Sequence, residues 1–244
     1  PDLLSATLTL THAEENAREV YADVLCASAE DYRIGQITGL PATSGPDGVA
    51  LIERFGQKTR NLVRKSLKQG FVERVSDDDA AWDFLHRIHE ENILALGGKP
   101  KPRHHFEVLR RTLPPEMRRL SLALDGNAPV AALLLLYGGE TVEYITPAVD
   151  VTARSRQPLS FLIWAGMLDA IDRGFAVWNW GGTWVNQTSL HHFKAGFGAK
   201  DHHYTYFTVA SAQGVANLRA RRAELGTLFP YFYTYPYAAL ANSS

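Results

Sequence analysis

The hydrophobic and polar positions of the chain predict strands and helices that alternate over most of its length. Apolar and polar residues alternate along 6–11, which is typical of a half-buried strand. Apolar residues recur at helical spacing along 13–25, and a second strand is expected at 32–40, just before Pro41. This strand–helix–strand unit is too small to bury a core alone, so it must pack on the rest of the chain.

The segment 48–69 is predicted to form one helix with a basic side. Arg60, Arg64 and Lys68 repeat every four residues on one face, and apolar residues share another. Such a stripe is commonly a solvated outer face. The alternative is a phosphate-binding stripe for a nucleotide, a lipid pyrophosphate or a tRNA backbone.

From residue 71 the predicted order is strand, helix, helix, three antiparallel strands, helix, strand, helix, strand. These elements are expected at 71–75, 77–96, 103–113, 120–124, 130–137, 141–146, 158–173, around Trp178, around Lys194, and at 204–209. Tight hairpin turns are expected at 125–127 and 138–139. An antiparallel meander continued by a parallel crossover is an α/β layout with a mixed sheet. Such a sheet opens where the meander meets the crossover strand, and ligands favour that kind of crevice.

The stretch 177–184 and the segment 190–199 together form a candidate site. The first is predicted to be a buried strand that ends at the pair Gly181-Gly182, and the second a short helix that carries Lys194. A strand that ends at glycines exposes backbone amides, which a ligand can approach closely. Lys194 beside Phe193 adds a point charge and a stacking face. The alternative for Lys194 is a solvated surface lysine.

Composition and charge narrow the class of protein. Apolar residues make up 45% of the 244 residues and charged residues 21%, as in ordinary soluble globular proteins. The net charge of −1 gives no global field that would favour nucleic acid or an anionic membrane. The single Cys26 excludes an intrachain disulfide and fits a reducing compartment, and the longest apolar run, 128–137, is too short to span a bilayer. We therefore expect a cytoplasmic protein.

The element order and four local motifs resemble acyltransferases of the GNAT superfamily, and more specifically the Fem family, which builds peptidoglycan cross-bridges. The motifs are the basic helix 59–70, the hairpin 125–130, Asn179-Trp180-Gly181-Gly182, and Phe193-Lys194-Ala195-Gly196-Phe197-Gly198-Ala199. The resemblance implies a mixed, mostly antiparallel sheet flanked by helices. Fem proteins carry two GNAT-like domains. The resemblance therefore implies the tail of a first domain at 1–50, a transferase domain at 51–210, and a C-terminal helix with an aromatic tail at 211–244.

The resemblance also implies transfer of an acyl or aminoacyl group onto an amine in peptidoglycan or cell-envelope assembly. The donor would be an aminoacyl-tRNA and the acceptor a peptidoglycan precursor, with the family's donor-side Phe-Lys pair at Phe193 and Lys194. Ordinary acetyl-CoA enzymes cradle the pyrophosphate in a glycine-rich turn, whereas the corresponding segment 152–158 has no glycine. Arg154 and Arg156 are candidates to replace those amides. Two alternatives stay open: a CoA-dependent N-acyltransferase for a polysaccharide or small amine, and a non-catalytic module that holds a nucleotide-bearing partner.

Aminolysis of an ester or thioester forms an oxyanion and releases a proton from the amine, so a cation and a base are needed. Lys194 is the candidate for the oxyanion or for a donor phosphate. Glu143 and Tyr144 point to opposite faces of one strand. Glu143 is expected to face outward, with a role as base as the alternative. Tyr144 is either a core residue or a proton donor to the leaving group, and Asn179 is a candidate to orient substrate.

Neither the histidines nor the C-terminal aromatic residues change this interpretation. Adjacent histidines at 104–105, 191–192 and 202–203 point apart, and no carboxylate or cysteine spacing supports them, so no metal site is expected. The aromatic stretch 228–237 is expected to pack over an exposed core edge. The alternative is peripheral contact with the inner face of the membrane, where a lipid-linked acceptor would lie.

Overall fold

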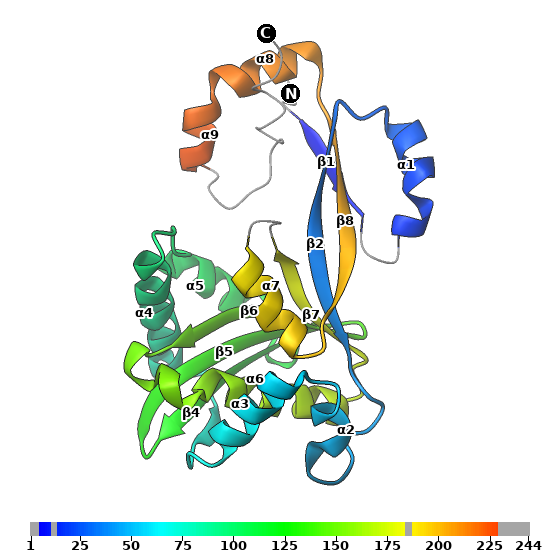
Figure 1. Ribbon diagram of the computed structural model, residues 1–244. Helices are drawn as coiled ribbons and strands as arrows, with labels where there is room; N and C mark the ends of the chain where they lie inside the picture. Colours follow the sequence, from blue (N-terminus) through cyan, green and yellow to red (C-terminus); the bar gives the residue numbers. More distant parts are fainter. Residues whose placement is uncertain (1–4, 11–13, 184–186, 229–244) are drawn as a thin grey trace. The chain divides into compact units, whose positions relative to one another are not determined.

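A computed structural model describes residues 5–10, 14–183 and 187–228 (Figure 1). The chain divides into two compact units. One combines the described residues up to Gly35 with Gly182, Thr183 and the described residues from Asp201 on; the other spans Gln36–Gly181 and Gln187–Lys200. The division at residues 50 and 210 that the sequence suggests stays a prediction.

The first unit contains an antiparallel strand pair and short helices. Strand β1 (Ala6–Thr9) pairs with β8 (Lys200–Val209), with Ala6 opposite Val209. The predicted helix 13–25 is a 3₁₀ turn, η1 (Glu15–Ala17), followed by α1 (Arg18–Leu25). At the C-terminal side are α8 (Ala212–Ala220) and α9 (Arg222–Leu228), which bury Leu218 and Leu225. Most of the predicted aromatic tail, from residue 229 on, lies outside the described residues.

The second unit contains the mixed, mostly antiparallel sheet that the sequence predicts. Its strand order is β2-β7-β6-β5-β4-β3, where β2 contributes its part from Gln36 on. All adjacent pairs from β3 to β6 are antiparallel, and the β6–β7 pair is parallel. The strands are β2 (Ala29–Gly39), β3 (Val72–Val75), β4 (Arg118–Asp125), β5 (Ala128–Gly138), β6 (Thr141–Val149) and β7 (Val177–Thr183). The helices of this unit are α2 (Val49–Ile52), α3 (Gln57–Leu67), α4 (Asp79–Ala95), α5 (Arg103–Thr112), α6 (Pro158–Asp172) and α7 (Thr188–Gly196), with 3₁₀ turns η2 (Pro46–Gly48), η3 (Pro115–Met117) and η4 (Val151–Arg156).

Strand β5 lies between two hydrophobic cores, one on each face of this sheet. Its side chains alternate: Leu133 and Leu135 belong to the core that α6 covers, and Leu134 belongs to the core that α4 covers. A strand buried on both faces needs apolar residues at every position. This is why the sequence shows an unbroken apolar run here.

The predicted hairpins are confirmed on both sides of β5. The ladder closes with Asp125 opposite Ala128, and with Gly138 opposite Thr141, so each turn has two central residues. The first central residue has positive φ in both turns, 60° at Gly126 and 54° at Gly139. Glycine adopts this left-handed backbone without the steric penalty of a side chain.

The single helix predicted at 48–69 is wrong, because the segment forms two helices, α2 and α3, that are separated at 53–56. Gly56 has an extended backbone, with φ −60° and ψ 150°. Its N–H donates a 2.8 Å hydrogen bond to the carbonyl of Gly196 in α7 rather than to its own helix. The break therefore depends on a contact with a distant segment, which helical spacing cannot reveal.

Helix α6 is the most deeply packed helix of the second unit. Its residues Leu162, Ile163 and Met167 are fully buried against the sheet. The apolar residues of α6 therefore pack into the hydrophobic core of the second unit. In the part of the chain that the structure describes, we find no helix with both the length and the apolar character needed to cross a membrane.

Candidate active site

Strands β6 and β7 pair over only three residues each, and their separation defines the candidate site. The parallel register ends at Glu143 and Asn179. Strand β6 then contains a β-bulge at Ile145, which is skipped in the pairing with β5, and continues to Val149. The opening lies where the sequence predicts it, between the last meander strand and the crossover strand.

A continuous chain of hydrogen bonds joins four predicted site residues at this opening. Oε1 of Glu143 accepts a bond of 3.0 Å from Nδ2 of Asn179. Oδ1 of Asn179 accepts a bond of 2.9 Å from the N–H of Gly181. The carbonyl of Gly181 accepts a bond of 3.3 Å from Nζ of Lys194. The candidate base and the candidate cation are therefore connected through β7.

Lys194 is buried, so the interpretation as a solvated surface lysine is wrong. Its side chain lies on α7 and the residue is only 3% exposed. Burial disfavours the charged form and lowers the pKa of Lys194 to about 8. Phe193, the preceding residue, packs edge-on against Trp180 and Phe197 at centroid distances of 6.1 and 5.3 Å. The Phe-Lys pair is thus fixed by an aromatic cluster.

Glu143 does not face outward as expected. It is half-buried, because the neighbouring strand places Asn179 directly opposite it in the register and offers a hydrogen bond. Burial raises the pKa of the Glu143 carboxyl, and the bond from Asn179 opposes that rise. A half-buried carboxyl with a raised pKa is a candidate general base.

Tyr144 lies on the opposite face of β6, in the core. Its ring packs between Trp178 and Trp180, at centroid distances of 6.3 and 4.9 Å. Burial raises the pKa of the Tyr144 hydroxyl, so it stays protonated at any ordinary pH. The geometry supports the core interpretation of Tyr144.

A cavity of about 340 Å³ opens beside the β6 edge. It is lined by residues of α4, the end of β6, η4, the start of α6, and α7: Asn92, Pro147, Val149, Arg154, Gln157, Pro158, Leu159, Ser160 and Phe193. It brings together two predicted binding residues, Arg154 and Phe193. The N-terminus of α6 also borders the cavity, and such an end attracts negative charge.

Arg156 lies outside the lining of this cavity and is held elsewhere. Its Nη2 lies 2.6 Å from Oδ2 of Asp125 in the β4–β5 turn, and its guanidinium lies 5.3 Å from the ring centre of Phe71. The guanidinium lowers the pKa of Asp125. Arg156 therefore fastens η4 to the hairpin, and Arg154 is the arginine of this segment that faces the cavity.

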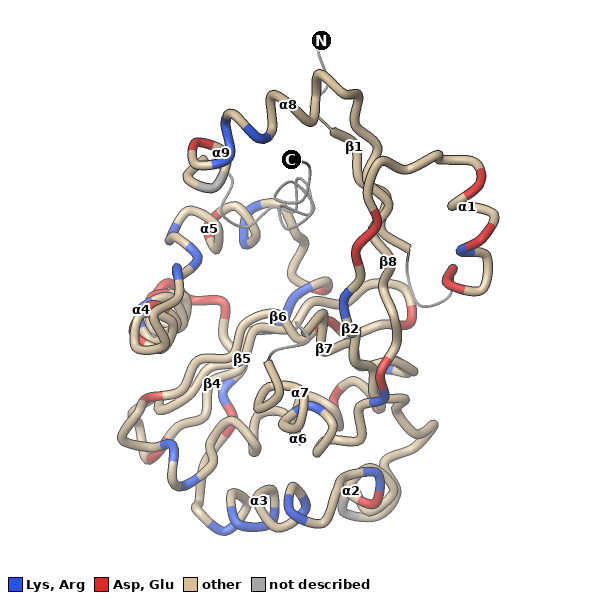
Figure 2. Tube along the Cα trace, turned by 45° about the horizontal axis from the view of Figure 1, so that its top comes forward, with Lys and Arg blue, Asp and Glu red and all other residues tan. Residues whose placement is uncertain are grey.

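The basic stripe of α3 does not contribute to the cavity either. Arg64 and Lys68 are exposed, and Nη2 of Arg60 donates a 2.7 Å hydrogen bond to Gln57 on its own helix. Figure 2 shows the run of basic positions along α3. Arg64 and Lys68 thus belong to a solvated face, whereas Arg60 is partly buried. Gly182, the second glycine of the predicted pair, falls in the other compact unit.

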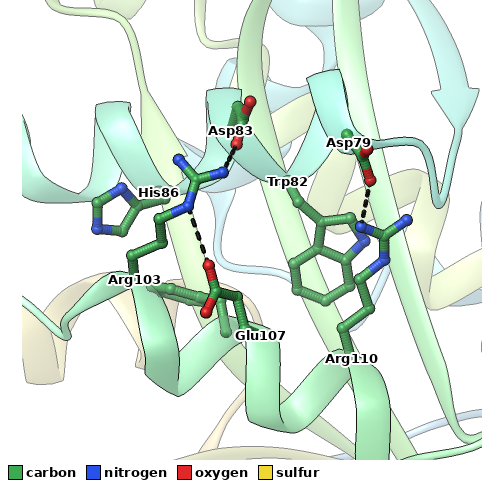
Figure 3. A pocket seen from close by; sticks show the side chains of 8 residues that line it. Asp79, Trp82, Asp83, His86, Arg103, Glu107 and Arg110 are labelled. Atoms are coloured by element: carbon green, nitrogen blue, oxygen red, sulfur yellow. Dashed lines mark hydrogen bonds and ion pairs between the residues drawn. The ribbon is translucent and has the colours of Figure 1, made fainter.

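A second cavity, of about 300 Å³, lies between α4 and α5 and contains none of the predicted residues (Figure 3). Arg103 pairs with Asp83 and Glu107, and Arg110 lies 2.7 Å from Asp79. Each arginine that lines it is already matched by a carboxylate. We interpret these contacts as exposed ion pairs on α4 and α5, which contribute little to stability.

Two residues near the β6 bulge were missed by the sequence analysis. Nζ of Lys101 donates to the carbonyl of Ile145 at 3.4 Å and to Oγ1 of Thr146 at 3.1 Å. Burial lowers the pKa of Lys101. The other is Asn92, whose side chain lines the 340 Å³ cavity. No sequence motif distinguishes Asn92 and Lys101 from other asparagines and lysines, because their contacts with β6 arise only when α4 packs on the sheet.

The described residues contain no group of three His, Cys, Asp or Glu side chains placed to hold a metal ion. The rings of His191 and His192 contact each other edge to face, with centroids 5.8 Å apart and an interplanar angle of 87°.

Comparison with known proteins identifies the class. Residues 53–208 match the acetyltransferase (GNAT) domain family, so the chain belongs to that family and is an acyltransferase. No curated protein sequence matches the chain.

The solved structures show the fold. A crystal structure of FemX aligns with a TM-score of 0.66 at 15% identity, over 84% of this chain and 71% of that one. The C-terminal domain (DUF2156) of a proposed lysylphosphatidylglycerol synthetase from Agrobacterium fabrum aligns with a TM-score of 0.56 at 13% identity, over 87% and 75%. A conserved protein from Bacteroides thetaiotaomicron gives 0.59 at 13% identity, over 80% and 67%. The resemblance to the GNAT superfamily and to the Fem proteins is confirmed at the level of the fold.

Proposed function

We propose that the protein transfers an acyl or aminoacyl group from an ester or thioester donor to an amine acceptor in cell-envelope assembly. The observation that carries the proposal is the hydrogen-bonded chain from Glu143 through Asn179 and Gly181 to Lys194, at the opening of the sheet. The fold likeness to FemX, and to a protein named for the lipid lysylphosphatidylglycerol, supports the envelope setting.

The donor is proposed to bind in the 340 Å³ cavity. Arg154 and the N-terminus of α6 supply positive charge at its border, which suits the phosphates of an aminoacyl-tRNA or an acyl-CoA. Phe193 supplies an aromatic face for a base or for the acyl group. Lys194, the next residue on α7, is proposed to act on the donor's carbonyl.

In the reaction, the acceptor nitrogen attacks the carbonyl carbon and a C–N bond forms. The carbonyl oxygen becomes an oxyanion, to which the Lys194 ammonium donates a hydrogen bond. Collapse of the intermediate breaks the C–O or C–S bond, and the leaving oxygen or sulfur takes up one proton, which balances the proton that the amine loses. With a pKa of about 8, Lys194 is largely protonated at neutral pH, and burial strengthens its interaction with the developing charge.

Glu143 is proposed to be the general base. It accepts the proton that the acceptor amine loses as the C–N bond forms. Its raised pKa makes it a stronger base than an exposed glutamate, while the bond from Asn179 fixes its orientation. The acceptor is proposed to be a peptidoglycan precursor or another amine of the envelope.

The test measures transfer by mass spectrometry from two donors, a 3′-O-lysyl-adenosine ester and acetyl-CoA. The acceptors are a nucleotide-linked peptidoglycan pentapeptide, which offers an amine, and phosphatidylglycerol vesicles, which offer a hydroxyl. The second acceptor tests whether the group is transferred to a hydroxyl rather than to an amine. Lys194→Met should reduce the rate on the order of 10²–10³-fold, because one oxyanion donor is lost. Lys58→Met, an exposed lysine on α3, is the control and should leave the rate unchanged. Absence of transfer from both donors, or full activity of Lys194→Met, would overturn the proposal.

A further inference from the structure

At the edge of β6 that borders the cavity, the backbone N–H and C=O groups of alternate residues are directed away from β5. The N–H of Asp150 donates to the carbonyl of Val130 at 3.0 Å, which marks the residues that bond to β5. Alternate residues of a strand direct their backbone groups to opposite sides. The N–H and C=O positions of Pro147 and Val149 therefore lie on the side where β7 has separated, and both residues line the cavity.

This edge offers no open N–H donor at either residue. Pro147 has no N–H at all. The N–H of Val149 donates to Oδ1 of Asn92 at 3.0 Å, and the carbonyl of Val149 accepts from Nδ2 of Asn92 at 3.0 Å. The carboxamide of Asn92 thus pairs with Val149 as a neighbouring strand would.

From this pairing we infer that Asn92 is a specificity-determining residue. It occupies the backbone groups of Val149, so a donor with an extended, amide-containing arm cannot pair with the β6 edge. Ligands with a peptide-like arm bind to open strand edges by adding a strand, and this mode needs unpaired backbone donors and acceptors. With Asn92 in place, the donor must be held by the side chains and the helix end of the cavity. The inference rests on the proposed use of the cavity as the donor site.

Helix α4 does not need Asn92 for its position. Trp82, Leu85 and Ile88 anchor α4 in the core beneath the sheet, with Leu85 fully buried. Asn92 lies in the last turns of the helix and is only partly buried. Its removal should therefore change the cavity edge while the fold is kept.

The experiment compares coenzyme A with 3′-phospho-ADP, which lacks the pantetheine arm and its two amides. Calorimetry on the full chain gives both dissociation constants, and their ratio reports what the arm contributes. In the wild-type protein the two should bind equally, or not at all. In Asn92→Ala the opened Val149 N–H and C=O should pair with the arm, so coenzyme A should gain about tenfold over the nucleotide.

Two further variants separate this role from a structural one. Asn92→Asp keeps an acceptor for the Val149 N–H and should keep the ratio of the wild type. Glu91→Ala, an exposed neighbour on α4, should change nothing. The inference is overturned if the wild type already binds coenzyme A ten times tighter than the nucleotide, or if Asn92→Ala shows no gain. Failure of the proposed function would appear instead as absence of transfer, which this binding ratio does not measure.

Discussion

Asn179 donates a hydrogen bond of 3.0 Å to Glu143 across the last pair of the parallel β6–β7 register. The same side chain accepts from the N–H of Gly181 with its other end, so both ends of the carboxamide are used. An asparagine fixed at both ends orients Glu143 at the point where the sheet opens. It also lowers the pKa of Glu143, against the effect of burial.

The pH dependence of transfer should report this bond. Glu143 acts as a base only when it is deprotonated, so the rate should fall as the pH drops through the pKa of Glu143. Because burial raises this pKa, the fall should begin at a higher pH than an exposed glutamate would give. Asn179→Ala removes the bond that lowers this pKa, so the acid limb of the rate profile should move to higher pH. Glu143→Gln should lose about 10²–10⁴-fold in rate. An acid limb that stays in place in Asn179→Ala would contradict the assignment.

Lys194 should set the alkaline limb. The ammonium is the working form, so transfer should decline as the pH rises through about 8, its lowered pKa. In Lys194→Arg the guanidinium stays charged at higher pH, and the alkaline limb should shift upward even if the rate is lower. Rate profiles of both proteins between pH 6 and pH 10 check this, with Lys58→Met as the control. If the wild-type rate does not decline on the alkaline side, the Lys194 ammonium is not the group that donates to the oxyanion.

Arg154 and Arg156 form a matched pair on one segment, because only the first lines the cavity. Arg154→Ala should raise the donor KM on the order of tenfold with little change in kcat, since a charge-assisted contact to phosphate is lost. Arg156→Ala removes the contact with Asp125 and should leave the donor KM near the wild-type value. Steady-state kinetics with a phosphate-bearing donor distinguish the two variants. Equal effects would show that the segment acts as a unit.

The contact between α3 and α7 should depend on the lack of a side chain at Gly196. A Cβ at this position would lie 2.3 Å from Oγ1 of Thr59. Gly196→Ala should therefore destabilise the protein by about 1–3 kcal/mol in urea unfolding, through overpacking. Gly138→Ala is the control, because no heavy atom lies within 4 Å of its added Cβ. The double variant Thr59→Ala with Gly196→Ala should recover part of the loss, and no recovery would contradict the steric explanation.

The site shows where sequence reasoning succeeds and where it stops. Asn179, Gly181 and Lys194 could be selected in advance, since they occur in short motifs on adjacent elements. Asn92 and Lys101 could not, because they reach β6 from α4 and from the segment after it, far away in the chain. Glu143 was selected as a candidate, but its exposure was predicted wrongly, because its side chain is half-buried beside Asn179. Strand alternation gives two faces without saying which neighbour fills either of them.

The sequence by itself determined the order of elements, the buried central strand and the glycine turns at Gly126 and Gly139. These follow from local patterns: an unbroken apolar run, and backbone angles that favour glycine. Only the tertiary structure decided the break before α3, the burial of Lys194 and the pairing of Asn92 with Val149. Each of these depends on groups that are distant in sequence and meet only after packing. Burial and hydrogen-bond partners, which set the pKa of Glu143 and Lys194, are properties of that packing.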